Sequence, residues 1–326
     1  MQATTEQVAQ ASLAPTWMWG AFIVFVLIML ALDLFVFGGN KAKRVSVREA
    51  ALWSVLWFGL ALAFNFMLWL YLGAQAGSQV ADQKALEFLT GYLIEKSLSV
   101  DNVFVFYLIF SSFSISIEYQ RRILLYGVLG AIVMRALIIL AGAWLVREFH
   151  WILYGFGLFL LITGMRMLIM ADAKPDLQKN LLFRLARRTL RLDPDYRGEH
   201  FVVHHNGVRY FTPLFLALIM IEGTDLVFAV DSIPAIFAVT TDPFIVFTSN
   251  IFAILGLRAL YFLLADSAER FHLLKYGLAM VLTFIGSKML IAPWYHVPIA
   301  ASLTIVVVLI AASVIASLFV ARRNTE

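Results

Sequence analysis

The chain has 326 residues, of which 62% are hydrophobic and only 14% are charged. A soluble globular chain has about 45–50% apolar and about 25% charged residues, so this composition excludes a soluble fold of that kind. The chain contains no cysteine, which excludes disulfides, thiolate metal ligands and cysteine nucleophiles. The formal net charge is only +4, so the placement of the charges is more informative than their sum.

Nine apolar stretches are long enough to cross a membrane. A spanning helix needs about 20 mostly apolar residues, because the hydrocarbon core of a bilayer is about 30 Å thick. In chain order the stretches are residues 17–37, 51–72, 86–113, 122–146, 151–171, 212–238, 244–265, 272–292 and 298–320. The sequence therefore predicts an all-α transmembrane fold with about nine spanning helices.

The charges of the loops predict the orientation of these spans. Cytoplasmic loops carry an excess of Lys and Arg. With nine spans, eighteen Lys and Arg residues fall in the loops of one side, whereas only Lys84 and Arg147 fall on the other. We therefore expect a multi-pass protein with its N-terminus outside and its C-terminus in the cytoplasm. The chain begins without a basic segment before its first apolar run, so we expect no cleaved signal peptide.

A basic loop, residues 172–211, separates an N-terminal transmembrane half (1–171) from a C-terminal half (212–326). Its segment LLFRLARRTLR (181–191) is typical of an amphipathic helix that lies on the inner membrane surface. The following segment, 200–212, predicts a β-hairpin that turns at Asn206-Gly207. The three histidines of this hairpin either bind metal or belong to an exposed strand, and the second interpretation is favoured; they are His200, His204 and His205.

Two membrane segments repeat each other. YGFGLFLLITGMRMLI (154–169) and YGLAMVLTFIGSKMLI (276–291) share Tyr-Gly, a later Gly, a basic residue and Met-Leu-Ile at identical spacing. Upstream, EKSLSVD (95–101) matches DLVFAVD (225–231), with an acid at each end of both segments. An Arg-Ala-Leu sequence follows each of these motifs on the next span, at Arg135 and at Arg258.

Spans three to five (86–171) are therefore predicted to repeat as spans six to eight (212–292), with span 298–320 outside the repeat. Because three is odd, the second unit crosses the membrane in the opposite sense. Inverted repeats are typical of secondary transporters, whose substrate site lies near the midplane between the repeats.

Acidic residues occur inside the predicted spans. A charged residue at the bilayer centre costs at least about 2.5–3.5 kcal/mol, so such residues are functional candidates. Span three contains Glu95 and Asp101, and span six contains Glu222, Asp225 and Asp231. Asp33 lies nearer the inner end of span one.

Helical geometry relates these acids to neighbouring polar residues. Glu95 and Asn102 are seven residues apart and share a helix face, as do Asp225 and Ser232. Asp101 and Asp231 lie about 120° away from the first acid of their motif, so a straight helix does not aim each pair at one point. Gly223 and Pro234 flank the motif of span six, which predicts a locally broken helix there.

Two interpretations of the acids are open. In one, they pair with the basic residues inside the bundle, Lys96, Arg135 and Arg258. In the other, the acids outnumber these structural counter-charges and form a cation site. The ligands predicted for that site are Glu95, Asp101, Asn102, Glu222, Asp225, Asp231 and Ser232, with Asn250 as a further oxygen donor. Hard oxygen ligands suit Mn²⁺, Ca²⁺ or Mg²⁺ and argue against a copper or thiolate site.

The segments EKSLSVDNVFVF (95–106) and DLVFAVDSIPAIFAVTTDPFIVFTSNIFAILGLRALYFLL (225–264) resemble the TerC family, particularly its Alx branch. The resemblance extends over essentially the whole chain. It implies a bacterial inner-membrane exporter of divalent manganese, built on inverted three-helix repeats. An older label for the Alx branch is redox modulator, for which this cysteine-free chain offers no thiol chemistry.

The sequence therefore predicts a secondary transporter that exports Mn²⁺ by alternating access and is not an enzyme. Its expected partners are a divalent cation, the lipid bilayer and a coupled proton, since buried carboxylates can exchange a proton for a metal ion. We expect no resident cofactor and no nucleic acid. The alternative is a membrane accessory protein that supports metal loading or redox handling of other proteins without transport of its own.

Overall fold

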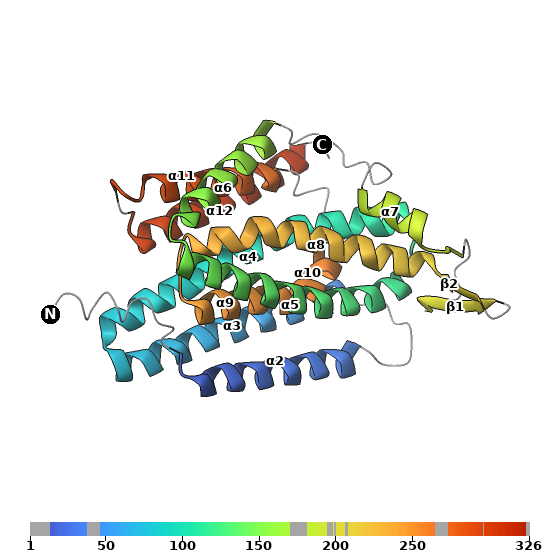
Figure 1. Ribbon diagram of the computed structural model, residues 1–326, viewed down its shortest axis with the longest axis horizontal. Coiled ribbons are helices and arrows are strands. Elements are labelled where there is room, and N and C mark those ends of the chain that lie inside the picture. Colours follow the sequence, from blue (N-terminus) through green and yellow to red (C-terminus); the bar gives the residue numbers. More distant parts are fainter. Residues whose placement is uncertain are drawn as a thin grey trace.

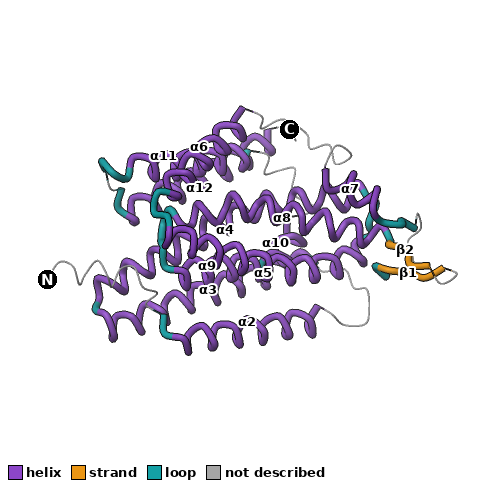
Figure 2. The backbone as a smooth tube through the Cα atoms, viewed as in Figure 1, coloured by secondary structure: helices purple, strands orange, loops and turns teal. Residues whose placement is uncertain are grey.

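A computed structural model describes residues 14–37, 46–169, 181–193, 198, 200–205, 208–264, 273–295 and 297–323 (Figure 1). The side chains of Asp33 and Asp101 lie outside this description. In chain order the elements are α2 (Thr16–Phe37), α3 (Val47–Ala76), α4 (Ser78–Ser112), α5 (Ile117–Glu148), α6 (Ile152–Ile169), α7 (Leu181–Thr189), β1 (Val202–His205), β2 (Val208–Phe211), α8 (Pro213–Phe237), α9 (Pro243–Leu255), α10 (Leu257–Leu264), α11 (Leu274–Ile291) and α12 (Ile299–Arg323). Most helices run along the long axis of the molecule, and the hairpin lies at one end (Figure 2).

Each of the nine predicted spans contains a helix in the structure. Within the described residues, seven helical segments are long and apolar enough to cross a membrane: α3, α5, α6, α8, the α9–α10 pair, α11 and α12. The other two predicted spans correspond to α2, with 22 residues, and α4, with 35 residues. An all-α membrane protein is therefore confirmed, and the count of nine spans stays a prediction.

The connection between α3 and α4 is shorter than the sequence suggests. The apolar stretches predict a loop over residues 73–85, but both helices continue beyond the apolar residues and a single residue, Gly77, joins them. Gly77 has φ of +91°, a conformation that L side chains rarely adopt. The polar segment that follows it is helical because helix formation does not require apolar residues.

The predicted break in span six is wrong. Helix α8 is continuous from Pro213 to Phe237, with Pro234 inside its last turn. A proline near the end of a helix disturbs few backbone hydrogen bonds, so it does not divide α8. Span seven is divided instead, because α9 ends at Leu255 and α10 begins at Leu257.

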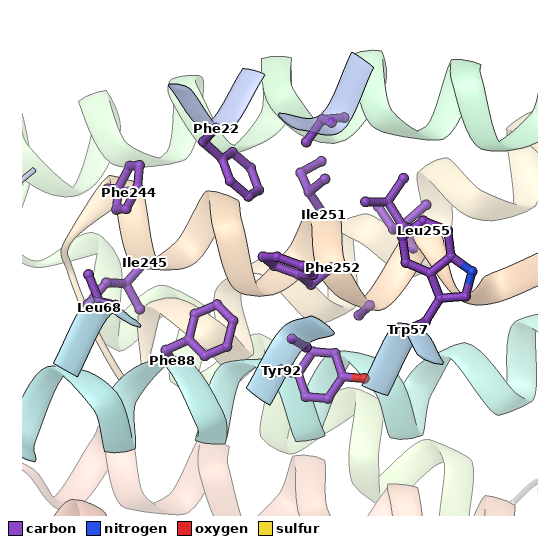
Figure 3. Packing of buried hydrophobic residues seen from close by; sticks show 14 of the residues in the cluster. Phe22, Trp57, Leu68, Phe88, Tyr92, Phe244, Ile245, Ile251, Phe252 and Leu255 are labelled. Carbon is purple, nitrogen blue, oxygen red and sulfur yellow. The ribbon is translucent and has the colours of Figure 1, made fainter. Parts of the chain in front are cut away.

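Helix α9 is at the centre of the largest apolar cluster, which α2, α3 and α4 surround (Figure 3). Eleven of its thirteen residues are buried. Phe252 is fully buried among aromatic rings, with its ring centroid 5.0 Å from Phe64 and 5.7 Å from Phe22. This packing fixes the position of the polar face of α9, which contains Asn250.

Helices α6 and α11, which belong to the two halves of the predicted repeat, pack closely through glycines. A Cβ atom at Gly164 would lie 2.8 Å from the carbonyl oxygen of Ala279. A Cβ atom at Gly286 would lie 2.7 Å from the carbonyl oxygen of Gly157. In the alignment of the two repeats, Gly164 corresponds to Gly286 and Gly157 to Ala279. The two contacts therefore involve corresponding positions of the predicted repeat, which itself stays a prediction.

This interface predicts a large difference between two glycine-to-alanine substitutions. A Cβ atom at Gly286 would lie 2.6 Å from the backbone nitrogen of Leu161, so α6 and α11 must separate in Gly286→Ala. Overpacking of this kind costs about 1–3 kcal/mol. We expect a lower midpoint of thermal unfolding for the purified protein in detergent.

The control is Gly59→Ala in the middle of α3, where no atom lies within 4 Å of a built Cβ. Alanine is a better helix former than glycine by about 1 kcal/mol, so this variant should match or exceed the native midpoint. Equal midpoints for the two variants would contradict the close contact between α6 and α11.

The predicted elements of the basic loop are confirmed. Helix α7 occupies residues 181–189, and β1 pairs with β2 in an antiparallel hairpin in which His204 faces Arg209. The turn residues Asn206 and Gly207 lie outside the described residues. His204 is exposed on its strand, as the favoured interpretation of the histidines expects.

Candidate cation site

A buried arginine joins the two motif helices. Arg135 of α5 lies between Glu95 of α4 and Asp225 of α8, and the three side chains are at most 3% exposed. The guanidinium makes a bidentate contact with Asp225, donating from Nε to Oδ2 at 3.2 Å and from Nη2 to Oδ1 at 2.9 Å. Its Nη1 donates to Glu95 Oε1. The predicted pairing of the acids with Arg135 is therefore present.

Two neutral polar residues complete this group. Asn250 of α9 accepts a hydrogen bond from Arg135 Nη1 at 3.2 Å and donates from Nδ2 to Glu95 Oε2 at 3.1 Å. Ser232 Oγ lies 3.5 Å from the same Nη1. The central charge cluster thus consists of Glu95, Arg135, Asp225, Ser232 and Asn250. It draws these residues from α4, α5, α8 and α9.

The central charge cluster combines two carboxylates with one guanidinium, so its formal charge is −1. Desolvating ions costs several kcal/mol each, and hydrogen bonds must offset that cost. Here all four carboxylate oxygens and all three guanidinium nitrogens make contacts. Because Arg135 is shared by both carboxylates, the cluster keeps an excess of one negative charge.

The remaining predicted ligands lie outside the cluster. Asn102 is 1% exposed, and neither its Oδ1 nor its Nδ2 has a hydrogen-bond partner. Glu222 is half-buried against Gly130 of α5, and its Oε2 is buried without a partner. Each lies on the same motif helix as one acid of the cluster: Asn102 with Glu95, and Glu222 with Asp225.

The second acids of the two motifs are not brought to the cluster by any described contact. Asp231 is half-buried on α8, about 120° around the helix from Asp225. The side chain of Asp101 lies outside the described part of the structure. Among the described residues, no three His, Asp or Glu side chains are close enough together to hold a metal ion. The full seven-residue ligand set therefore stays a prediction.

Lys96 occupies the break between α9 and α10. Its Nζ donates to the carbonyl oxygen of Ala253 at 3.4 Å, near the C-terminal end of α9. A cation is favourable there because the helix dipole places partial negative charge at that end. A Cβ atom at Gly256 would lie 2.6 Å from Lys96 Nζ, so glycine leaves room for the ammonium group. The other predicted counter-charge, Arg258, is buried in the first turn of α10.

A second polar network connects α4 with the α8–α9 turn. Glu87 Oε2 accepts from Lys84 Nζ at 2.8 Å and from Thr240 Oγ1 at 2.6 Å. Lys84 Nζ also lies 4.0 Å from Asp242, whose Oδ1 accepts from the N–H of Phe244 and caps α9. Sequence reasoning missed this network. Its available signals were the Lys84–Glu87 spacing of three and the aspartate before Pro243.

The two networks differ in their position along the motif helices. Glu95 and Asp225 lie near the middle of α4 and α8, whereas Glu87 and Thr240 lie at the end of the bundle that is predicted to face outside. Toward the opposite end, Asn102 and Glu222 have buried polar atoms without partners, and on the outer side of Glu95 the hydroxyl of Tyr92 is another such atom. The hydrogen bond from Thr240 to Glu87 therefore joins α4 to the α8–α9 turn at the predicted outer end.

The model of the integral membrane protein TerC family matches residues 80–325 of the chain. The chain belongs to the TerC family. The Alx proteins of Salmonella typhi and Escherichia coli K12 are each 56% identical to it over 289 residues, which is 89% of this chain and 90% of each relative. Their names propose a membrane-bound redox modulator. An uncharacterized membrane protein of Myxococcus xanthus is 49% identical over 305 residues, 94% of this chain and 93% of the relative. No solved structure matches the chain.

Both polar networks lie within the range that the TerC family model matches. The central charge cluster and the network around Glu87 lie within the matched residues 80–325, whereas α2 and α3 precede them. The predicted inverted repeat, 86–171 and 212–292, also lies within that range. The TerC match therefore covers every residue of the candidate site.

Proposed function

We propose that this TerC protein is a secondary transporter of the bacterial inner membrane that exports a divalent cation, with Mn²⁺ as the favoured substrate. Nine spans would place the N-terminus outside and the C-terminus in the cytoplasm. Spans three to five and six to eight would form the inverted repeat. Cation release from one side and binding from the other would follow from movement of one repeat against the other.

The observation that carries this proposal is the convergence of Glu95 and Asp225 from the two motif helices. They occupy corresponding positions in the two predicted repeats, and both contact Arg135 near the middle of their helices. Their oxygens, with those of Asn250 and Ser232, are the hard ligands that Mn²⁺, Ca²⁺ and Mg²⁺ accept. Asp101, Asn102, Glu222 and Asp231 would complete the ligand set in a conformation in which the motif helices have moved.

In the conformation described here, the Arg135 guanidinium lies between the two carboxylates. A divalent cation at that point would compete with it, because both would occupy the same oxygens. Arg135 is therefore the proposed counter-charge that stabilises the cation-free cluster, and it is not a proposed ligand.

The second candidate function is an accessory role in metal loading or redox handling of other proteins. The names of the Alx relatives support it, since they propose a redox modulator. The chain has no cysteine, so a thiol-based redox reaction would need a partner protein to supply the thiols. The two candidates differ in whether the purified protein alone moves metal.

The test of the proposal is metal flux in vesicles that contain only the purified protein. A Mn²⁺-sensitive dye in the lumen should report uptake well above that of protein-free vesicles. Parallel measurements with Ca²⁺ and Mg²⁺ rank the substrates. If a helical, monodisperse protein moves none of the three cations, the transporter proposal is wrong and the accessory role is favoured.

Proton coupling predicts that an imposed pH gradient changes this flux. If metal and protons move in opposite directions, a lumen more acidic than the medium should accelerate Mn²⁺ uptake, and the medium should acidify as uptake proceeds. Each pH unit supplies about 1.4 kcal/mol per coupled proton. The membrane voltage is clamped during the measurement. Uptake that ignores the gradient would leave a uniporter as the simpler mechanism.

A further inference from the structure

Helix α7 carries three arginines on one side. Arg187 and Arg188 lie three and four residues after Arg184, so each is a neighbour of Arg184 on the helix surface. All three are exposed, and none pairs with an acidic side chain in the described part of the chain. Like charges at this spacing repel each other. A bound anion would relieve that repulsion.

The arginines surround a hollow of about 370 Å³, which is lined by Phe183, Arg184, Arg187 and Arg188. Guanidinium groups bind phosphate through pairs of parallel hydrogen bonds, which is why arginine is common in phosphate sites. The hollow therefore has the charge and the donors to bind a phosphate group.

The position of α7 indicates the source of this phosphate. Phe183 packs on Phe113, the C-terminal capping residue of α4, with ring centroids 6.0 Å apart. Ala186 is buried, and α7 packs against α8 beside the predicted cytoplasmic end of the bundle (Figure 1). Leu185, about 100° around the helix from Ala186, is 56% exposed. An amphipathic helix at this level has its polar side among headgroups and its apolar side at the acyl boundary.

We propose that Arg184, Arg187 and Arg188 bind the phosphate-bearing headgroup of an anionic phospholipid in the cytoplasmic leaflet. Its acyl chains extend along the exposed Leu185 and the ends of the membrane helices. The arginines supply the charge complementarity, and Phe183 fixes the helix that presents them. This site lies apart from the central charge cluster, and its existence does not depend on cation transport.

The test measures lipid binding to the purified full chain in detergent by native mass spectrometry. Dioctanoyl-phosphatidylglycerol is the anionic probe, dioctanoyl-phosphatidylcholine the zwitterionic one, and inorganic phosphate the free anion. We expect saturable binding of phosphatidylglycerol and much weaker binding of the other two probes. The triple variant Arg184→Gln, Arg187→Gln, Arg188→Gln should weaken phosphatidylglycerol binding by about 100-fold, since each arginine near an anionic headgroup contributes about fivefold.

A matched triple variant controls for the loss of three charges. Arg48, Arg191 and Arg209 are exposed basic residues on the same predicted side and lie outside the hollow. Arg48→Gln, Arg191→Gln, Arg209→Gln should keep binding within about twofold of native, well below the fivefold expected for a single headgroup contact. The charge-preserving variant Arg184→Lys, Arg187→Lys, Arg188→Lys should bind more tightly than the glutamine triple, which separates loss of charge from loss of fold.

Three outcomes would overturn the proposal. Equal weakening by the two glutamine triples would mean that only overall charge matters. Equal binding of phosphatidylcholine and phosphatidylglycerol would show that the site does not select an anionic headgroup. If inorganic phosphate bound as tightly as phosphatidylglycerol, the hollow would be a site for a soluble anion.

Discussion

Arg135→Met is expected to reduce the yield of folded protein severely. The substitution leaves Glu95 and Asp225 buried together without a cationic partner. Removing one partner from a buried ion pair costs about 3–5 kcal/mol, because the remaining charge stays desolvated. Two carboxylates are left here, and they also repel each other. The measurement is the fraction of protein that remains monodisperse after detergent extraction, together with its thermal unfolding midpoint.

Arg147→Met is the matched control, because Arg147 lies on the same helix but is exposed in its last turn. Its stability should be close to native, since exposed charges contribute about 0–1 kcal/mol. A further variant combines Arg135→Met with Glu95→Gln and Asp225→Asn, which removes all three charges. It should recover much of the folded yield and transport no cation. If Arg135→Met alone behaves like Arg147→Met, the central charge cluster is not a structural requirement.

Much of the fold follows from the sequence because a membrane imposes a simple rule. A bilayer requires apolar stretches of a minimum length, and each such stretch in this chain contains a helix. The same rule does not determine the residues at which the helices begin and end. Nothing in the apolar pattern predicts that α4 begins at Ser78, because its first turns are polar and helical at once. The helix boundaries depend on local hydrogen bonding at residues such as Gly77.

The candidate site was predicted in part for a similar reason. Acids inside an apolar helix need a partner, so their pairing with Arg135 could be expected from charge alone. The position of the helix break could not be predicted in this way. Pro234 is the stronger helix breaker in the sequence, but in the last turn of α8 it does not interrupt the helix. The break lies at Gly256 instead, where the absence of a Cβ atom leaves room for Lys96. Contacts between distant helices decide such features, and a single sequence does not contain them.

The two networks have different consequences for a transporter. At the predicted outer end, Glu87 accepts hydrogen bonds from Lys84 of the same helix and from Thr240 of the α8–α9 turn. Toward the predicted cytoplasmic end, Asn102 and Glu222 keep buried polar atoms without partners. Buried polar atoms without partners are costly, so they favour any state that supplies water or a cation to them.

Neutralising the second acid of either motif should abolish most transport. Asp231 is half-buried in the membrane-spanning part of α8 with no described partner, and Asp101 takes the corresponding place in the other repeat. Asp101→Asn and Asp231→Asn keep the size of the side chain and remove its charge. Loss of one charged ligand should weaken cation binding, so we expect each variant to lower Mn²⁺ flux in vesicles by about 10-fold to 100-fold, which corresponds to about 1.4–2.8 kcal/mol. Asp82→Asn is the control, since Asp82 is exposed on α4 and accepts a hydrogen bond from Trp69 that asparagine can keep. Native flux in both Asp101→Asn and Asp231→Asn would remove these acids from the cation path and limit the site to the central charge cluster.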